Sequence, residues 1–253
     1  MSLVSPLGID VTERTPAADL RRLIAALKPL EANLIRIGPP GDGGYLLPDD
    51  LDGIEYAFSP GVSTQSGFEA GLARRGIKVF MADYSVDGPG EAHANFVFDK
   101  KFVGCLSNEK FMTMDEWKQK RIPDFDGDLL LQMDIEGCEY ETILSTSSRL
   151  LAQFRIIVVE VHFIEQWLCK PHFELVSRAI EKLLQTHSVV HIHPNNVAGS
   201  IRSQGLELPR IVEISLQRND RIRERRPATQ FPHPLDADNT DRPSLKLPDA
   251  WYR

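Results

Sequence analysis

From residue 54 onward, short apolar runs alternate with segments whose apolar residues recur at helical spacing. Seven runs have the length of β-strands, and several are apolar almost throughout, as strands buried on both faces are. Strands that alternate with helices predict a parallel sheet covered by helices on both sides. The predicted strands lie at residues 54–58, 77–83, 94–98, 128–134, 154–163, 188–193 and 210–217.

The last connection between strands differs from the others. Residues 194–209, "PNNVAGSIRSQGLELP", contain no convincing helical pattern. Because parallel neighbours need a long crossover, usually a helix, the seventh strand is expected to pair antiparallel. The predicted fold class is therefore α/β, with a seven-stranded, mostly parallel sheet, an antiparallel last strand and helices on both faces.

The flanking segments complete the predicted organisation. Residues 1–53 hold an amphipathic helix at 16–30, with Thr15 as its N-cap, followed by a Gly- and Pro-rich loop at 36–51 that is expected to form a lid or wall. Residues 54–218 form the sheet domain. Residues 219–253 contain the basic run "RIRERR" and five prolines, which predicts an extended C-terminal arm.

Composition narrows the possible partners and the compartment. The 253 residues are 42% apolar and 26% charged, as in ordinary globular proteins, and the formal charge of −7 disfavours nucleic acid as a partner. Three widely spaced cysteines, Cys105, Cys138 and Cys169, argue against a disulfide framework and fit a reducing cytoplasm. No apolar stretch is long enough for a membrane span, and residues 1–16 show no secretion signal.

The turn after the first strand bears on the cofactor. Its glycines are Gly61 and Gly67, not the three-glycine pattern that brings backbone against a pyrophosphate, so NAD and FAD are disfavoured. Asp83 ends the second strand, where a carboxylate can accept hydrogen bonds from ribose hydroxyls. A single glycine turn with this carboxylate favours S-adenosylmethionine, which contains adenosine but no phosphate. The alternative is that Gly61 only makes a turn and Asp83 only caps the strand.

Several segments, in consistent order, resemble the FkbM-type branch of class I methyltransferases. The strand-four segment "DLLLQMDIEGCEYETIL" is similar to that family's D-x-E-G-x-E signature, and "IIVVEVH" resembles its strand-five E-x-H ending. Further similar elements are "FMTMDEW" at 111–117, "GDGGYLLPDDL" at 41–51, "FSPGVSTQSGFE" at 58–69 and "HIHPNN" at 191–196.

This resemblance implies a Rossmann-like class I methyltransferase fold, S-adenosylmethionine as cofactor and methyl transfer, most often to oxygen. One departure stands out, because Ser59 occupies the position at the end of the first strand where the family usually has an acidic residue. Another group must then hold the cofactor's amine. The cofactor-binding residues that we predict are Ser59, Gly61, Asp83, Tyr84, Asp134 and Glu136.

Three carboxylates follow the fourth strand within six residues. Asp134 ends a buried strand at the edge where ligands bind in parallel sheets, and it is expected to be both catalytic and close to the cofactor. Glu136 and Glu139 are three residues apart and are expected to share a helix face near the helix start. For Glu136 a site role and a capping role stay open, whereas Glu139 is assigned to the helix start.

His162 is the predicted catalytic residue on the acceptor side. It alternates with Glu160 at the end of the fifth strand, so both side chains point to one face. An imidazole titrates near neutral pH and can act as a base or as a metal ligand. Asp134, His162 and His193 are the candidate ligands of a divalent metal, whose use stays open.

The leading hypothesis is an S-adenosylmethionine-dependent methyltransferase that methylates a hydroxyl on a sugar, glycan or secondary metabolite. The acceptor would be a small molecule or a carbohydrate, with no nucleic-acid partner and a cytoplasmic location. Two alternatives remain at this point. One is a nucleotide-dependent Rossmann oxidoreductase, and the other is a non-catalytic methyltransferase-like binding module.

Overall fold

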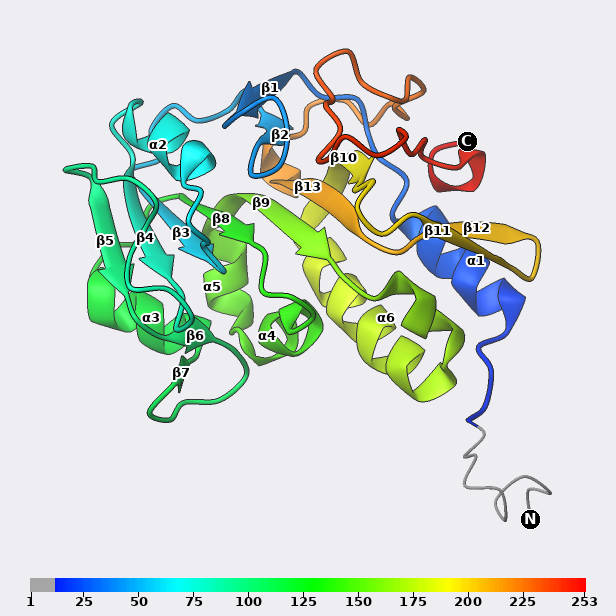
Figure 1. Ribbon diagram of the computed structural model, residues 1–253, viewed down its shortest axis with the longest axis horizontal. Coiled ribbons are helices and arrows are strands. Elements are labelled where there is room, and N and C mark those ends of the chain that lie inside the picture. Colours follow the sequence, from blue (N-terminus) through cyan, green and yellow to red (C-terminus); the bar gives the residue numbers. More distant parts are fainter. Residues whose placement is uncertain (1–11) are drawn as a thin grey trace.

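The computed structural model describes residues 12–253, and its centre is a seven-stranded sheet (Figure 1). The strands follow the order β10-β13-β9-β8-β3-β4-β5 across the sheet. All seven predicted strands are present, within two residues of the expected bounds. They are β3 (Tyr56–Pro60), β4 (Lys78–Ala82), β5 (Phe96–Asp99), β8 (Leu129–Met133), β9 (Phe154–Val161), β10 (His187–Pro194) and β13 (Val212–Arg218).

The antiparallel last strand is confirmed. β13 lies between β9 and β10 and pairs antiparallel with both, whereas the pairs β3–β4, β4–β5, β3–β8 and β8–β9 are parallel. The chain between β10 and β13 forms a small hairpin, β11 (Ser200–Ser203) and β12 (Leu206–Pro209), in place of a crossover helix. The structure therefore confirms the predicted fold class.

Helices cover the two faces of the sheet unequally (Figure 1). One apolar cluster joins the sheet to α1 (Ala17–Ala26), α3 (Met114–Arg121), α4 (Glu139–Ser145), α5 (Ser148–Gln153) and α6 (Lys170–Leu184). The cluster on the other face involves α2 (Gly67–Ala73) and a hairpin of β1 (Leu34–Ile37) and β2 (Tyr45–Pro48). The smaller elements are β6 (Phe102–Val103), β7 (Phe111–Met112), η2 (Ile164–Leu168), η3 (Asn219–Arg221) and η4 (Asp249–Trp251).

Three local expectations need correction. Residues 45–48 form strand β2 and are not loop, because pairing with β1 outweighs the turn signals around them. Thr15 does not cap α1, since its hydroxyl donates to the Trp167 carbonyl at 2.6 Å. The apolar spacing over residues 137–151 predicts a single helix, but the structure divides this segment into α4 and α5 at Thr146, whose backbone is extended.

The C-terminal segment 219–253 lies along β10 and β13 (Figure 1). Asp236 accepts a hydrogen bond from His191 Nε2 at 2.8 Å, and the Asn196 amide donates to the Thr240 carbonyl at 2.9 Å. Near its end, Trp251 is fully buried against Trp167. The division at residues 53 and 218 stays a prediction.

No helix within residues 12–253 is both long and apolar enough to cross a membrane. Residues 1–11, on which most of the expectation about a secretion signal depends, lie outside the described residues.

Candidate active site

The ends of β3 and β8 meet at one edge of the sheet. Gly61 follows β3 with φ +89°, and a Cβ on it would lie 1.4 Å from the carbonyl oxygen of Asp134. The Gly61 amide donates to the Ala82 carbonyl at 2.9 Å, which fixes the turn against β4. The turn and the backbone of Asp134 are in direct contact, and this close approach leaves room only for glycine at position 61.

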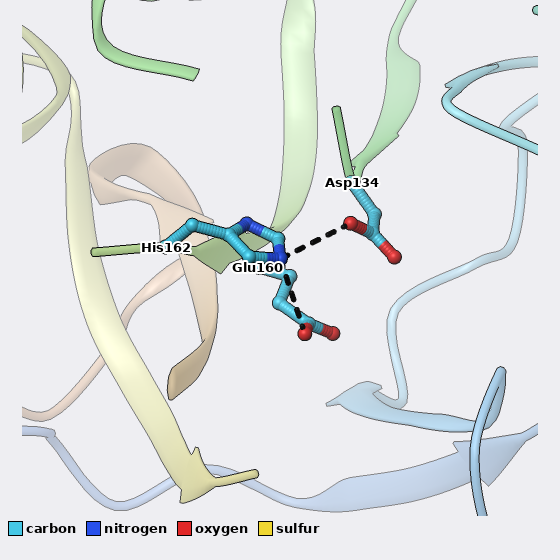
Figure 2. A group of neighbouring side chains, drawn as sticks. All are labelled: Asp134, Glu160 and His162. Carbon is cyan, nitrogen blue, oxygen red and sulfur yellow. Dashed lines mark ion pairs between the residues drawn. The ribbon is translucent and has the colours of Figure 1, made fainter. Parts of the chain in front are cut away.

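His162 follows β9 and faces three carboxylates, of which Figure 2 shows Asp134 and Glu160. Its Nε2 atom lies 3.8 Å from Asp134 Oδ1, 3.6 Å from Glu160 Oε1 and 3.5 Å from Glu136 Oε2. His162 as a whole is only 4% exposed. The ends of β8 and β9 thus converge on one imidazole nitrogen, because parallel neighbours end at the same edge of a sheet.

Glu139 holds the other side of the same imidazole. Its Oε1 lies 3.0 Å from His162 Nδ1 and accepts hydrogen bonds from the backbone amides of Ile135 and Gly137. Glu139 is the first residue of α4, as expected, but its fully buried carboxylate braces both the turn and the histidine. With Nδ1 as donor to this carboxylate, Nε2 is directed at the cavity.

Glu136 does not share a helix face with Glu139, contrary to expectation. It lies in the turn before α4 with φ +54°, and its side chain is 85% exposed. A positive φ is uncommon for a residue with a Cβ and is associated with functional turns. The turn directs Glu136 towards the cavity instead of along α4.

Burial and mutual repulsion perturb the titration of the cluster. Burial raises the pKa of Asp134 to about 7, and burial together with the Asp134 charge raises the pKa of Glu160 well above its ordinary value. Burial lowers the pKa of His162, but the hydrogen bond that Nδ1 donates to Glu139 and the nearby carboxylates outweigh it, so that this pKa is raised. The group therefore favours bound positive charge.

Two cavities adjoin at this edge and share Gly61, Asp134 and Glu136 in their walls. The first, of about 470 Å³, we call the apolar hollow; it is lined by Ala82, Val86, Phe102, Val103, Phe111 and Ile135, with Asp83 at its rim. The second, of about 450 Å³, we call the acidic cavity; its carboxylates are Asp42, Glu69, Asp134, Glu136 and Glu160. Among the described residues, no lysine or arginine lines the acidic cavity.

The profile of the methyltransferase FkbM domain matches residues 78–219, more than half of the chain. The chain belongs to the FkbM methyltransferase family. The match includes β4, β8, β9 and β13, and with them Asp83, Asp134 and His162. Membership supports methyl transfer as the activity of this FkbM-family protein.

Solved structures with some similarity are also methyltransferases. One is a mutant of the 16S rRNA (adenine(1408)-N(1))-methyltransferase from Catenulisporales acidiphilia, with 10% identity, a TM-score of 0.31, and coverage of 73% of this chain and 98% of that one. Another is the Burkholderia thailandensis 1,6-didemethyltoxoflavin-N1-methyltransferase, with 14% identity, a TM-score of 0.32, and coverage of 83% and 93%. No curated protein sequence matches the chain.

Four of the six predicted cofactor residues of this FkbM-family protein line the cavities, and two do not. Gly61, Asp83, Asp134 and Glu136 are in the walls. Tyr84 packs on Phe102 with ring centroids 5.5 Å apart, outside the lining of either cavity. Ser59, the other exception, is buried behind the acidic cavity.

The Ser59 hydroxyl connects two residues that do reach the acidic cavity. It donates to Glu69 Oε1 at 2.6 Å and lies at the same distance from Gln132 Oε1. Burial raises the pKa of Glu69, and the hydrogen bond from Ser59 opposes that shift. The serine at the end of the first strand is thus hydrogen-bonded to a buried carboxylate, that of Glu69 from α2.

The predicted metal set is brought together only in part. Asp134 and His162 are neighbours, and Glu160 completes a group whose ligand atoms all lie within 4.8 Å of one another. His193 is on β10, where its Nδ1 lies 3.6 Å from Asp236 in the C-terminal segment. Because β13 separates β9 from β10, His193 is not part of this group.

Sequence reasoning left out several residues of the site. Glu160 carried a usable signal, since it stands two positions before His162 on the same strand face. Glu69 stands in the segment that resembles the family but was not assigned to the site. Asn239 and Thr240 line the acidic cavity from the C-terminal segment, and no local sequence pattern predicts this position.

Proposed function

We propose that this protein transfers a methyl group from S-adenosylmethionine to a hydroxyl of a small-molecule or carbohydrate acceptor. The observation that carries the proposal is the junction of the apolar hollow and the acidic cavity at Gly61 and Asp134. S-adenosylmethionine supplies a methyl group activated by a sulfonium cation. A junction of this kind lets one cavity bind the cofactor while the other positions the acceptor. Holding the two reactants in line accounts for much of the rate acceleration in a displacement reaction such as methyl transfer.

The residues of the apolar hollow fit an adenosine. Its walls offer apolar and aromatic surface for a base, including Phe102, Val103 and Ile135. Asp83 uses Oδ1 to accept hydrogen bonds from the Ser85 amide and hydroxyl, both at 2.6 Å, which orients its carboxylate at the rim. We assign Asp83 to the ribose hydroxyls.

Glu69 is the group that we assign to the cofactor's amine. It is 5% exposed, lines the acidic cavity beside Gly61 and is held by Ser59. A buried carboxylate of this kind is stabilised by pairing with an ammonium group, because burial otherwise disfavours its charge. In this way Ser59 contributes to cofactor binding through Glu69 and not by contact.

The acceptor hydroxyl is assigned to the face formed by His162 and Asp134. His162 Nε2 takes up the hydroxyl proton, and Asp134 and Glu160 stabilise the resulting imidazolium, while the oxygen–methyl bond forms and the sulfonium–methyl bond breaks. Asp42 and Tyr45 also line this cavity. Since no lysine or arginine of the described residues lines this cavity, a neutral or cationic acceptor is favoured over a phosphorylated one. The cytoplasmic location stays a prediction.

Calorimetry with S-adenosylhomocysteine and with NAD tests the proposal against its rivals. We expect S-adenosylhomocysteine to bind and NAD not to. An Asp83→Ala change removes charge-assisted hydrogen bonds worth about 1.5–3 kcal/mol, so it should weaken binding about 10- to 100-fold. Asp87→Ala is the matched control, because Asp87 is exposed and pairs only with Lys100 in the described part of the chain. Failure to bind S-adenosylhomocysteine, or NAD binding in its place, would refute the proposal.

A further inference from the structure

We propose that Asp134, Glu160 and His162 form a binding site for a divalent metal cation. The cation would lie between Asp134 Oδ1, Glu160 and His162 Nε2, at the face assigned to the acceptor. Binding of the cation depends only on these residues, whereas its role in catalysis rests on the proposed function.

The spacing of the donor atoms suits one cation. Two ligands at about 2.1 Å from a metal lie about 3.4 Å apart in tetrahedral geometry. Nε2 of His162 is 3.6 Å from Glu160 Oε1 and 3.8 Å from Asp134 Oδ1, and the whole group falls within 4.8 Å. Small side-chain rotations would therefore bring all three atoms into coordination distance.

One of these donor atoms, Asp134 Oδ1, is a buried atom without a hydrogen-bond partner within residues 12–253. His162 is 4% exposed, and its hydrogen bond is made through Nδ1 while Nε2 points between the carboxylates (Figure 2). Buried polar atoms are almost always satisfied, so an unpaired Asp134 Oδ1 that lies 3.8 Å from His162 Nε2 points to a ligand between them.

The surrounding residues hold the three side chains as a metal site requires. Glu139 hydrogen-bonds to His162 Nδ1 at 3.0 Å, which is the carboxylate–histidine arrangement that fixes a metal-binding imidazole. The Asn195 amide donates to Glu160 Oε1 at 3.1 Å. Both ligands from the end of β9 are thus oriented by a neighbour.

Local charge favours a cation at this position. Besides the ligands, Glu136 and Glu139 face the imidazole, and Glu213 on β13 is the register partner of Glu160. The single histidine is the one basic group among them. A divalent cation would offset this repulsion more fully than one proton can.

The donor set points to the chemical class of the cation. Two carboxylates and one imidazole suit Mn²⁺, Fe²⁺ or Zn²⁺ better than an all-oxygen ion such as Ca²⁺. A cation here would bind the acceptor oxygen and lower the pKa of its hydroxyl, so that the proton would pass to solvent and His162 Nε2 would act as a ligand in place of a base. Glu139 would then be a positioning residue, acting through His162.

The test is a titration of the full-length, chelator-treated protein with Mn²⁺. Binding is measured as the decrease in the electron paramagnetic resonance signal of free Mn²⁺. We expect one Mn²⁺ per chain. Glu160→Gln should weaken binding by at least tenfold, and Glu139→Gln by about 10- to 100-fold, as changes next to metal ligands do. Circular dichroism verifies that each variant is folded.

Glu213→Gln is the matched control, because it removes a neighbouring buried charge but no ligand. Its affinity for Mn²⁺ should stay within threefold of the wild type. The absence of stoichiometric binding at 1 mM Mn²⁺, or equal weakening by Glu160→Gln and Glu213→Gln, would overturn the site. Calorimetry with S-adenosylhomocysteine on the same preparations is separate, so a protein that binds this cofactor but no Mn²⁺ refutes the metal site alone.

Discussion

Replacing Gly61 with alanine should destroy cofactor binding, because this glycine is where β3 and β8 touch. The new Cβ would lie 1.4 Å from the Asp134 carbonyl oxygen, whereas carbon–oxygen contacts normally begin at about 3.3 Å. One of the two segments must therefore move by about 2 Å. A misplacement of about 1 Å can cost 100-fold in rate, so a shift of this size at the cavity junction should affect both ligands.

A matched control separates this contact from backbone strain. Gly76 has φ +87°, close to the +89° of Gly61, but a Cβ on it would meet nothing within 4 Å. Both alanine variants incur the cost of a left-handed conformation, about 1–2 kcal/mol. Only Gly61→Ala also displaces Asp134.

The assay is calorimetry with S-adenosylhomocysteine on both variants, together with urea unfolding. Gly76→Ala should lose about 1–2 kcal/mol of stability and keep its affinity within twofold. Gly61→Ala should lose at least 100-fold in affinity. If the two variants bind the ligand equally well, the contact between Gly61 and Asp134 does not shape the site and the reasoning fails.

Three further predictions concern other parts of the structure. Glu69→Gln should lower the affinity for S-adenosylhomocysteine about tenfold by calorimetry and leave the affinity for adenosine unchanged, because adenosine lacks the amine. Equal losses of affinity for both ligands would contradict the assignment of Glu69 to the amine. Trp251→Ala should cost about 3–5 kcal/mol in urea unfolding, since the side chain is fully buried, whereas Leu235→Ala, at an exposed position in the same segment, should stay within about 0.5 kcal/mol. Asp236→Asn should cost about 2 kcal/mol at pH 7. Burial raises the pKa of Asp236, but the His191 hydrogen bond and nearby positive charge outweigh it and hold this pKa below its usual range. The contribution of Asp236 to stability is thus fully present above its pKa in the unfolded state, about 4, and is lost as the pH falls below it. A stability difference between wild type and Asp236→Asn that grows in acid would contradict this reasoning.

The sheet could be predicted because its strands are buried on both faces. Residues 128–134 and 154–163 are nearly continuous apolar runs, and that composition alone distinguishes a buried strand from its neighbours. The antiparallel β13 followed from a missing helix. The hairpin of β1 and β2 was missed because its two four-residue strands depend on pairing with each other, which turn-forming residues nearby conceal.

For the candidate site too, some features could be predicted from the sequence and others depend on the tertiary structure. By itself, the sequence determined that Asp134, Glu160 and His162 stand at strand ends, because strand length and alternation are local properties. Only the tertiary structure decided which of them meet. It placed Glu160, and not His193, beside Asp134, since β13 separates the sixth strand from the fifth.

Glu139, Glu69 and the C-terminal segment show the same physical reason most clearly. Each acts through contact with residues elsewhere in the chain: Glu139 with His162, Glu69 with Ser59, and Thr240 with Asn196. Local spacing carries the preference of a segment for helix or strand. It carries no measure of which buried carboxylate will lie 3 Å from which imidazole, because that distance depends on how all the strands and helices pack together.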